Sequence, residues 1–301
     1  MKNLVLRPLP PFRLDLTVWA LRRLPVNTID RWDGNTYRRL MVFDETPVEV
    51  SIIQKGSPDS PELRISVGGS AAKKHLSRVL PTIEKMLGLK VDLTDFYELA
   101  ANDERLLKVV RRFTGLKPPR FSSIFEALVN AFACQQLSLN VGIILLNRLS
   151  ATYGLRNGES HAFPRPADLS EARPEDLRKL GFSNRKAQYI LQISREAIAG
   201  QLDDDRFESL DDAAIAARLQ KFPGVGRWTT QYVSLRGLRR LNVFPADDVG
   251  GQNKLQNWLG LEERPDYETI NRILRGWSPY QGLVYFYMLL THLEQKRYLE
   301  I

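Results

Sequence analysis

Apolar and polar side chains alternate in several short runs near the start of the chain. A period of two is typical of a β-strand that buries one face. We expect strands at residues 12–16, 37–43, 48–52 and 63–67. The last two runs flank a segment rich in Gly, Ser and Pro, so they are expected to form an antiparallel hairpin with a long loop.

A helix is expected to follow the last of these strands. Gly68, Gly69 and Ser70 lead into a helical pattern at residues 71–87, with Pro81 inside it as a possible source of a kink. Gly88 comes directly after this pattern, and glycine is favoured just past a helix end. Residues 1–92 are therefore predicted to form a small α+β domain.

From residue 93 onward the apolar spacing is that of helices, and no further strand is expected. The main ranges with this spacing are 124–134, 141–149, 186–199, 210–219, 255–258, 267–274 and 280–293. Ser138 is expected to cap a helix, and Asp168 and Ser170 are expected to start short ones. The predicted fold class is α+β, with an α+β domain at 1–92 followed by an all-helical body at 93–301.

The helix at 210–219 is joined to a further helix, which has Trp228, Tyr232 and Leu238 at helical spacing. The turn between them contains two glycines and reads Phe222-Pro223-Gly224-Val225-Gly226. Backbone N–H groups at a helix start have no partner inside the helix, so such a turn is a natural phosphate-binding site. Phe244-Pro245 then breaks the chain before two carboxylates, Asp247 and Asp248. Because an acidic pair repels a phosphate backbone, its position beside this turn calls for a chemical explanation.

Composition and charge narrow the function classes only slightly. The chain has 301 residues, 43% of them apolar and 9% aromatic, which fits an ordered protein of two or three domains. Its net charge of +8 is compatible with nucleic-acid binding but is weak evidence alone. The single cysteine, Cys134, excludes an internal disulfide and a four-cysteine metal site. With no apolar window long enough for a membrane span, we expect a cytoplasmic protein.

Several segments together resemble the helix-hairpin-helix DNA glycosylases. The carriers are LxxFPGVGRWTxxYV at 219–233, the Arg236-Gly237 pair after it, FPADD at 244–248, FACQQLSLNVG at 132–142 and LRKLGFSNRKAQYI at 177–190. Within that superfamily the chain looks most like bacterial DNA-3-methyladenine glycosylase II. The resemblance implies an N-terminal antiparallel sheet like half of a TATA-binding protein, then a helical body with the helix-hairpin-helix at about 210–238.

Carried over by position, the resemblance implies that Asp248 is the catalytic aspartate. Trp228 stands where the bifunctional glycosylase-lyases carry a nucleophilic lysine, which implies an enzyme without lyase activity. Tyr232 matches an aromatic residue of the base pocket. Leu289 stands where the family places a tryptophan in that pocket, and the nearby Tyr285, Phe286 and Tyr287 can substitute for it.

The resemblance also implies where DNA is held. The turn and the helix start that follows it are expected to contact the DNA backbone through Gly224, Val225, Gly226, Arg227 and Thr229. Gln136 and Leu137 fall near the residue that fills the gap left by a flipped base, a position that is bulky and apolar in the most similar family. Relatives can bind a cation through carbonyls of the hairpin, but no catalytic metal and no cofactor is expected.

These assignments predict a monomeric DNA N-glycosylase of the nucleoid that acts on double-stranded DNA with alkylated bases, such as 3-methyladenine and 7-methylguanine. A base inside a duplex must be rotated into a pocket before it can be cut, at a cost of a few kcal/mol. Breaking the N-glycosidic bond places positive charge on the sugar, which a carboxylate stabilises while it orients water. A cationic alkylated base also stacks well on electron-rich rings.

Other interpretations of the same residues stay open. Either aspartate of the pair can be a helix N-cap, and we interpret Asp247 as structural and Asp248 as catalytic. Trp228 and Tyr232 are as typical of a core as of a pocket, and Tyr285 is more typical of a core. Gln135 and Gln136 can cap a helix end, and Cys134 can be a small apolar filler.

Two other functions also remain. The altered last helix is compatible with a glycosylase for oxidised or deaminated purines. The hairpin and the basic charge suffice for a catalytically silent DNA-binding protein, which we rank third because an aspartate that faces DNA gives a pure binder no benefit.

Overall fold

The computed structural model describes residues 2–68 and 72–300, and its N-terminal part is built on a five-stranded antiparallel sheet. The strand order is β1-β5-β4-β3-β2. The strands are β1 (Lys2–Leu6), β2 (Arg31–Trp32), β3 (Thr36–Phe43), β4 (Thr46–Lys55) and β5 (Glu62–Gly68). The predicted strands at 37–43, 48–52 and 63–67 are confirmed, and so is the antiparallel pairing of the last two.

The strand predicted at residues 12–16 is wrong, because this segment begins helix α1 (Leu14–Arg22). The helix is buried almost all round, between two hydrophobic cores. Leu14 and Val18 belong to the core that includes the sheet, whereas Leu16 and Trp19 belong to the core of the C-terminal helices. With apolar residues on opposite sides, the helix shows no single apolar stripe, and its first residues imitate the alternation of a strand.

Helix α2 (Ala72–Leu87) packs on the sheet and confirms the predicted helix, although its expected start at residue 71 lies outside the described residues. Val79, Ile83 and Leu87 belong to the same core as the strands. The helix contains Pro81 and ends before Gly88, whose φ of +65° is a conformation that glycine adopts without strain. The expected helix end at Gly88 is confirmed.

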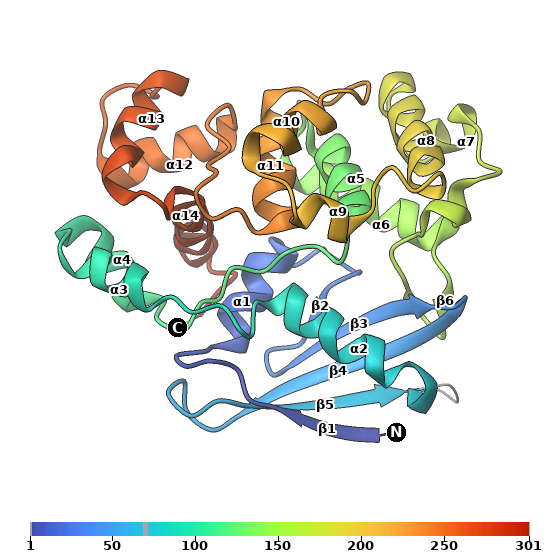
Figure 1. The fold of residues 1–301 in the computed structure, drawn as a ribbon, viewed down its shortest axis with the longest axis horizontal. Coiled ribbons are helices and arrows are strands. Elements are labelled where there is room, and N and C mark those ends of the chain that lie inside the picture. Colours follow the sequence, from blue (N-terminus) through green and yellow to red (C-terminus); the bar gives the residue numbers. More distant parts are fainter. Residues whose placement is uncertain (1, 69–71, 301) are drawn as a thin grey trace.

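The rest of the chain is mainly helical and lies above the sheet in Figure 1. Its α-helices are α3 (Thr94–Ala101), α4 (Glu104–Arg112), α5 (Ile124–Cys134), α6 (Leu139–Tyr153), α7 (Pro174–Lys179), α8 (Asn184–Ile198), α9 (Asp204–Glu208), α10 (Asp212–Leu219), α11 (Arg227–Leu238), α12 (Val249–Leu259), α13 (Tyr267–Leu274) and α14 (Gln281–Gln295). The predicted α+β class, with a sheet followed by a helical body, is confirmed.

Two local predictions for this part are wrong. A short ladder pairs β6 (Arg156–Asn157) with β7 (Ser160–His161), whereas no strand was expected there. The short helices expected to start at Asp168 and Ser170 are instead the 3-10 helix η1 (Pro166–Leu169) and α7, each with a proline in its first turn. Proline fits the first turn because the amide it lacks would have no partner there.

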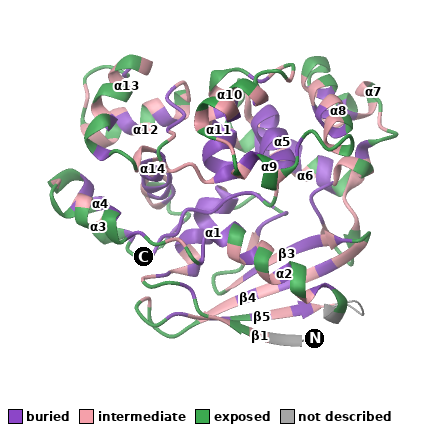
Figure 2. Cartoon of the chain, viewed as in Figure 1, coloured by how far each residue is buried: buried purple, intermediate pink, exposed green. Residues whose placement is uncertain are grey.

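Helix α5 is central to the helical body and is buried along nearly its whole length (Figure 2). It packs against α6, α8 and α11, and its residue Leu128 shares one core with Val50 of the sheet. The domain boundary at residue 92 remains a prediction. None of the helices in the described ranges combines the length and the apolar character needed to cross a membrane.

Candidate active site

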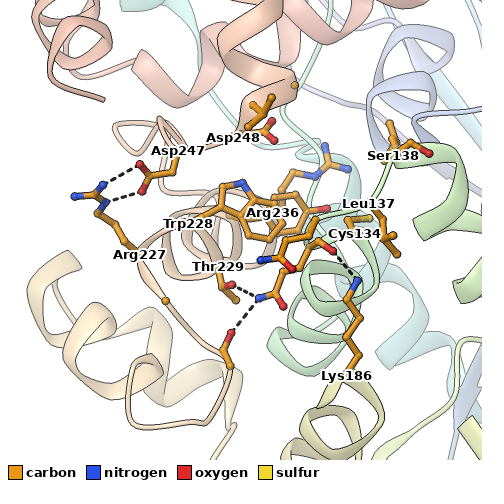
Figure 3. Close-up of a pocket in the computed structure, with 18 of the residues that line it drawn as sticks. Cys134, Leu137, Ser138, Lys186, Arg227, Trp228, Thr229, Arg236, Asp247 and Asp248 are labelled. Atoms are coloured by element: carbon orange, nitrogen blue, oxygen red, sulfur yellow. Dashed lines mark hydrogen bonds and ion pairs between the residues drawn. The ribbon is translucent and has the colours of Figure 1, made fainter. Parts of the chain in front are cut away.

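A cavity of 1160 Å³ lies where several parts of the helical body meet. Its lining comes from the turn before α11, the start of α12, the side of α14, the start of α8 and the segment between α5 and α6. Most of the residues singled out from the sequence reach it, although they are far apart along the chain. The tertiary structure therefore gathers the predicted site residues around one cavity (Figure 3).

The turn between α10 and α11 depends on Gly224 for two separate reasons. Its φ is +81°, and a Cβ at this position would lie 2.3 Å from Cδ2 of Tyr189. Gly226 is the N-cap residue of α11 and has no side chain to cap the helix, so the first amides of α11 face outward unpaired. In the part of the chain that the structure describes, the amides of Gly224 and Gly226 also make no hydrogen bond.

Val225 does not have the role that the sequence suggested. Its amide donates to the carbonyl of Phe222 at 3.1 Å inside the turn, and its side chain is buried. A phosphate therefore has no access to this amide. The amides left for an anion belong to Gly224, Gly226 and the first turn of α11, where the helix dipole also favours negative charge.

Thr229 is buried, and its hydroxyl is used inside the protein. Gln135 Nε2 donates to Thr229 Oγ1 at 2.8 Å and to the carbonyl of Gly224 at 3.0 Å. Lys186 Nζ in turn donates to the carbonyl of Gln135 at 2.6 Å. The Thr229 hydroxyl is therefore engaged inside the protein, and the predicted DNA contact of Thr229 is left to its backbone amide in the first turn of α11. Gln135 follows α5 as its C-cap residue, as one interpretation held. Its side-chain amide also donates hydrogen bonds to the hairpin, a role that could not be predicted from the sequence.

Gln136 and Leu137 lie at the edge of the cavity, before α6. Gln136 has a φ of +55°, a left-handed conformation that turns the chain sharply. Leu137 follows it with 43% of its surface exposed, which is unusual for an apolar side chain at a cavity rim. Ser138 is the N-cap of α6 and accepts from the amide of Val141 at 3.4 Å, so this cap is confirmed.

Asp247 forms an ion pair with Arg227. Arg227 Nε lies 2.6 Å from Oδ2 of Asp247, and its Nη2 lies 2.8 Å from Oδ1. The guanidinium also lies 3.8 Å from the ring centre of Tyr267. The Arg227 side chain, expected to contact DNA, is thus already engaged by a carboxylate and a ring.

Asp248 is the N-cap of α12, which corrects the structural part of the predicted assignment. Its Oδ2 accepts from the amide of Gly251 at 2.9 Å and from the hydroxyl of Tyr285 at 2.8 Å. A Cβ on Gly251 would lie 3.2 Å from Cε2 of Tyr285, so glycine lets this ring approach. Within residues 2–68 and 72–300, Oδ1 of Asp248 has no hydrogen-bond partner. In this part of the chain the second carboxylate oxygen is therefore not engaged by another protein group, and Asp248 lines the cavity.

Aromatic side chains form one wall of this cavity. The rings of Trp228 and Tyr232 stack with centroids 5.3 Å apart and an interplanar angle of 25°. Burial raises the pKa of Tyr232, so its hydroxyl stays protonated at neutral pH. Tyr285 and Leu289 line the cavity from α14. All four residues expected in a base pocket thus border the same space, and Tyr285, which the sequence favoured for the core, reaches it.

Two buried arginines line the same cavity, and sequence analysis missed both as site residues. Arg236 donates to the carbonyls of Ala20 and Leu21 at 2.8 and 3.1 Å. Arg23 comes from the N-terminal part of the chain and donates to the hydroxyl of Tyr232 at 2.8 Å. No local pattern in the sequence marks Arg23, because it reaches the cavity only when α1 packs against the helical body.

Positive charge predominates around the cavity. Its cationic lining residues are Arg23, Arg185, Lys186, Arg227, Arg236 and Lys254, and its carboxylates are Asp247 and Asp248. Burial lowers the pKa of Lys254, and the nearby Asp248 opposes that shift. Cys134 also lines the cavity instead of only filling the core. Among the residues that the structure describes, no three His, Cys, Asp or Glu side chains are grouped so as to hold a metal ion.

Comparisons with known proteins agree with this geometry. Residues 129–279 match the family described as HhH-GPD superfamily base excision DNA repair protein. A putative DNA-3-methyladenine glycosylase of Bacillus subtilis is 26% identical over 282 residues, which cover 93% of this chain and 95% of the relative. DNA-3-methyladenine glycosylase 2 of Escherichia coli is 28% identical over 180 residues, 59% of this chain and 61% of the relative.

The fold is similar to that of a solved structure, the 3-methyladenine DNA-glycosylase from Archaeoglobus fulgidus. The two superpose with a TM-score of 0.81 and are 25% identical, with 96% of this chain and 98% of the other covered. The similarity therefore extends over the sheet as well as the helical body.

Proposed function

Because the chain belongs to the HhH-GPD superfamily of base excision DNA repair proteins, we propose that it is a DNA N-glycosylase for alkylated bases, of the 3-methyladenine and 7-methylguanine type. The observation that carries the proposal is the open Oδ1 of Asp248 beside a cavity lined by Trp228 and Tyr232. The names of the relatives from Bacillus subtilis and Escherichia coli support the choice of alkylated bases.

DNA is held mainly through its backbone. The free amides of Gly224, Gly226 and the first turn of α11 bind a phosphate without reading the sequence. Lys186 and Arg185 at the cavity add non-specific attraction that weakens as salt is raised. The damaged nucleotide rotates into the cavity, and Leu137 fills the gap that it leaves in the stack. Unstacking costs least for a damaged base, which favours lesions over normal bases.

The reaction breaks the bond between C1′ of the sugar and the base nitrogen, and the bonding electron pair leaves with the base. Asp248 stabilises the positive charge that develops on the sugar. Its Oδ2 is fixed by Gly251 and Tyr285, so Oδ1 is free to face the sugar or to accept a proton from the attacking water. Water then supplies the hydroxyl at C1′. A base that is already cationic leaves without a general acid and stacks on Trp228.

We expect hydrolysis without strand cleavage. Trp228 occupies the position where bifunctional relatives carry a nucleophilic lysine. Lys254 is, however, an amine with a lowered pKa at the same cavity, so borohydride trapping on abasic DNA is the informative assay. No covalent adduct is expected. An adduct that disappears in Lys254→Arg would instead show that this chain is a lyase through a different residue.

The proposed activity is tested by incubating the protein with methylated DNA and measuring released bases. Asp248→Asn is expected to lose release by about 100-fold or more and to keep DNA binding. Asparagine is as good an N-cap as aspartate, so the variant keeps the start of α12. Full activity in this variant would exclude Asp248 as the catalytic group.

Two alternatives give different results in the same assay. A glycosylase for deaminated or oxidised purines would release only hypoxanthine or 8-oxoguanine from a panel of lesions. A silent binding protein would bind DNA in a salt-sensitive way and release no base from any lesion.

We further propose that the enzyme acts as a monomer on nucleoid DNA in the cytoplasm. Measurement of the molecular mass in solution tests the first part, and cell fractionation tests the second.

A further inference from the structure

Arg23 belongs to the buried part of the cavity lining. The residue is only 5% exposed, and Tyr232 beside it is 4% exposed, so both lie away from the mouth. The mouth is marked by exposed residues of the hairpin and by Leu137, which is 43% exposed. A group that enters past Leu137 therefore reaches Arg23 in the buried part of the cavity.

The guanidinium of Arg23 is held in place but keeps unused donors. Nη1 donates to the Tyr232 hydroxyl at 2.8 Å and to Cys134 Sγ at 3.9 Å, and Nη2 donates to Asn130 Oδ1 at 2.6 Å. Its Nε is buried and has no partner in the described part of the chain. A guanidinium has five N–H donors and no acceptor, so Arg23 offers the cavity N–H groups only.

The aromatic wall sets the direction in which a bound base meets these donors. Tyr232 stacks on Trp228, and its hydroxyl is the atom bonded to Arg23. Arg23 therefore lies beyond the phenolic end of the wall. A base that stacks on this wall, with its sugar at Asp248, presents its outer edge to Arg23.

Among the described residues, no carboxylate bonds directly to Arg23, although the charge of Asp30 acts on it. In the described residues it forms no ion pair, and its partners are a phenol, a thiol and an amide. Arg236 is a second buried cation that lines the cavity. A buried donor without an acceptor is costly, and a ligand that supplies the acceptor removes this cost.

We propose that Arg23 selects the base by its outer edge, with a carbonyl oxygen at position 6 preferred over an amino group. This inference rests on the proposed glycosylase function. Arginine donates well to guanine O6. Adenine has an amino group at this position, so an N–H of the base would face an N–H of Arg23 and neither donor would find an acceptor. Guanine-type and hypoxanthine-type bases are thus favoured over adenine-type bases. The positive charge of an alkylated base is stabilised when the base stacks on the electron-rich rings of this wall.

The test compares single-turnover excision of 7-methylguanine and 3-methyladenine by the wild-type protein and by Arg23→Gln. Glutamine is polar but shorter, so it removes the Nη1 and Nη2 donors that bond to Tyr232 and Asn130. The ratio of the two rate constants is compared between proteins, so the different intrinsic lability of the two lesions cancels. We expect the ratio of 7-methylguanine to 3-methyladenine excision to fall at least about tenfold in the variant, as for loss of one good base-edge contact.

Arg22→Gln is the matched control. Arg22 is the preceding residue and is equally buried, at 5% exposure. Its guanidinium donates to the carbonyls of Pro25 and Trp32 and does not belong to the cavity lining. The substitution perturbs packing to a similar degree but should leave the ratio unchanged.

A measurement on the wild-type protein keeps the inference testable if Arg23→Gln does not fold. Free hypoxanthine should inhibit the enzyme at least about tenfold more strongly than free adenine, because only hypoxanthine places an oxygen at Arg23. Equal inhibition by the two bases, or an unchanged excision ratio in Arg23→Gln, would overturn the inference and leave the proposed function intact. Absence of release of any lesion by the wild-type protein would overturn both.

Discussion

The hydroxyl of Tyr285 lies 2.8 Å from Oδ2 of Asp248 and donates to the oxygen that also caps α12. Both hydrogen bonds therefore act on one oxygen and orient the carboxylate, with Oδ1 left for the reaction. Burial raises the pKa of Tyr285 well above its ordinary value of 10.0, and Asp248 adds to the shift. The phenol thus remains a donor at neutral and moderately alkaline pH.

Removal of this hydroxyl should slow excision without weakening DNA binding. We expect Tyr285→Phe to lower the single-turnover rate constant about tenfold, as for loss of one hydrogen bond to a charged group. Tyr287→Phe is the control, because Tyr287 packs in the core near Phe96 and Phe113. An equal loss of activity in both variants would mean that the hydroxyl of Tyr285 has no special part in positioning Asp248.

Leu137 should matter for a base inside a duplex and not for folding. Because its side chain is 43% exposed, Leu137→Ala is expected to change the free energy of unfolding by less than about 0.5 kcal/mol. Excision from duplex DNA should fall severalfold, since the flipped state loses the side chain that fills the stack. Val141→Ala, at a residue 41% exposed on α6, should have no effect on excision. Equal rates for the two variants would contradict the assigned role.

The two glycines of the hairpin should respond differently to alanine. Gly224→Ala places a Cβ 2.3 Å from Tyr189 at a φ of +81°, so we expect a loss of more than about 1 kcal/mol of stability together with weaker DNA binding. At Gly226 no heavy atom lies within 4 Å of the added Cβ, so the fold should tolerate Gly226→Ala. Thermal unfolding and binding to an abasic-site duplex check both variants. Unaltered stability in Gly224→Ala would show that Tyr189 moves aside easily.

Asp204 should make stability depend on pH. Burial raises the pKa of its carboxyl from 3.8 to about 6, although its Oδ1 accepts from the amide of Ile124 at 2.8 Å. A raised pKa in the folded state means that protonation stabilises the fold. This contribution is complete below pH 3.8 and is lost as the pH rises through about 6.

Asp204→Asn should therefore be more stable than the wild type by about 1–3 kcal/mol at pH 7.5, with a smaller difference at pH 5. Asparagine can still accept from the Ile124 amide, so the hydrogen bond is kept. Denaturant unfolding at the two pH values measures the difference. Asp205→Asn is the control, because that side chain is 89% exposed and should show little pH dependence. A pH-independent difference for Asp204→Asn would argue against the raised pKa.

Features that depend on one short segment could be predicted from the sequence. The hairpin at Gly224 and Gly226, the strands with one buried face and the glycine after α2 follow from local backbone preferences and from simple periodicity. The catalytic role of Asp248 came from the family resemblance and remains a prediction. The sequence did not show that Asp248 is also the N-cap of α12, because capping depends on which carboxylate meets the amide of Gly251.

Features that depend on contacts between distant segments could not be predicted from the sequence. Helix α1 imitates a strand because separate cores bury opposite sides of it. The Val225 amide and Arg227 were predicted to contact DNA, and the sequence did not reveal their internal partners, the carbonyl of Phe222 and the carboxylate of Asp247. Gln135, which braces the hairpin through its side-chain amide, gave no sign of that role.

By itself, the sequence determined the order of sheet and helices, the turn with two glycines and the presence of a carboxylate near it, because each depends on residues close together along the chain. Only the tertiary structure decided the interior of the cavity. Arg23 and Tyr285 lie 262 positions apart in the numbering, yet both line it. Long-range packing brings them together, and the same packing places buried N–H donors where the outer edge of a base would lie.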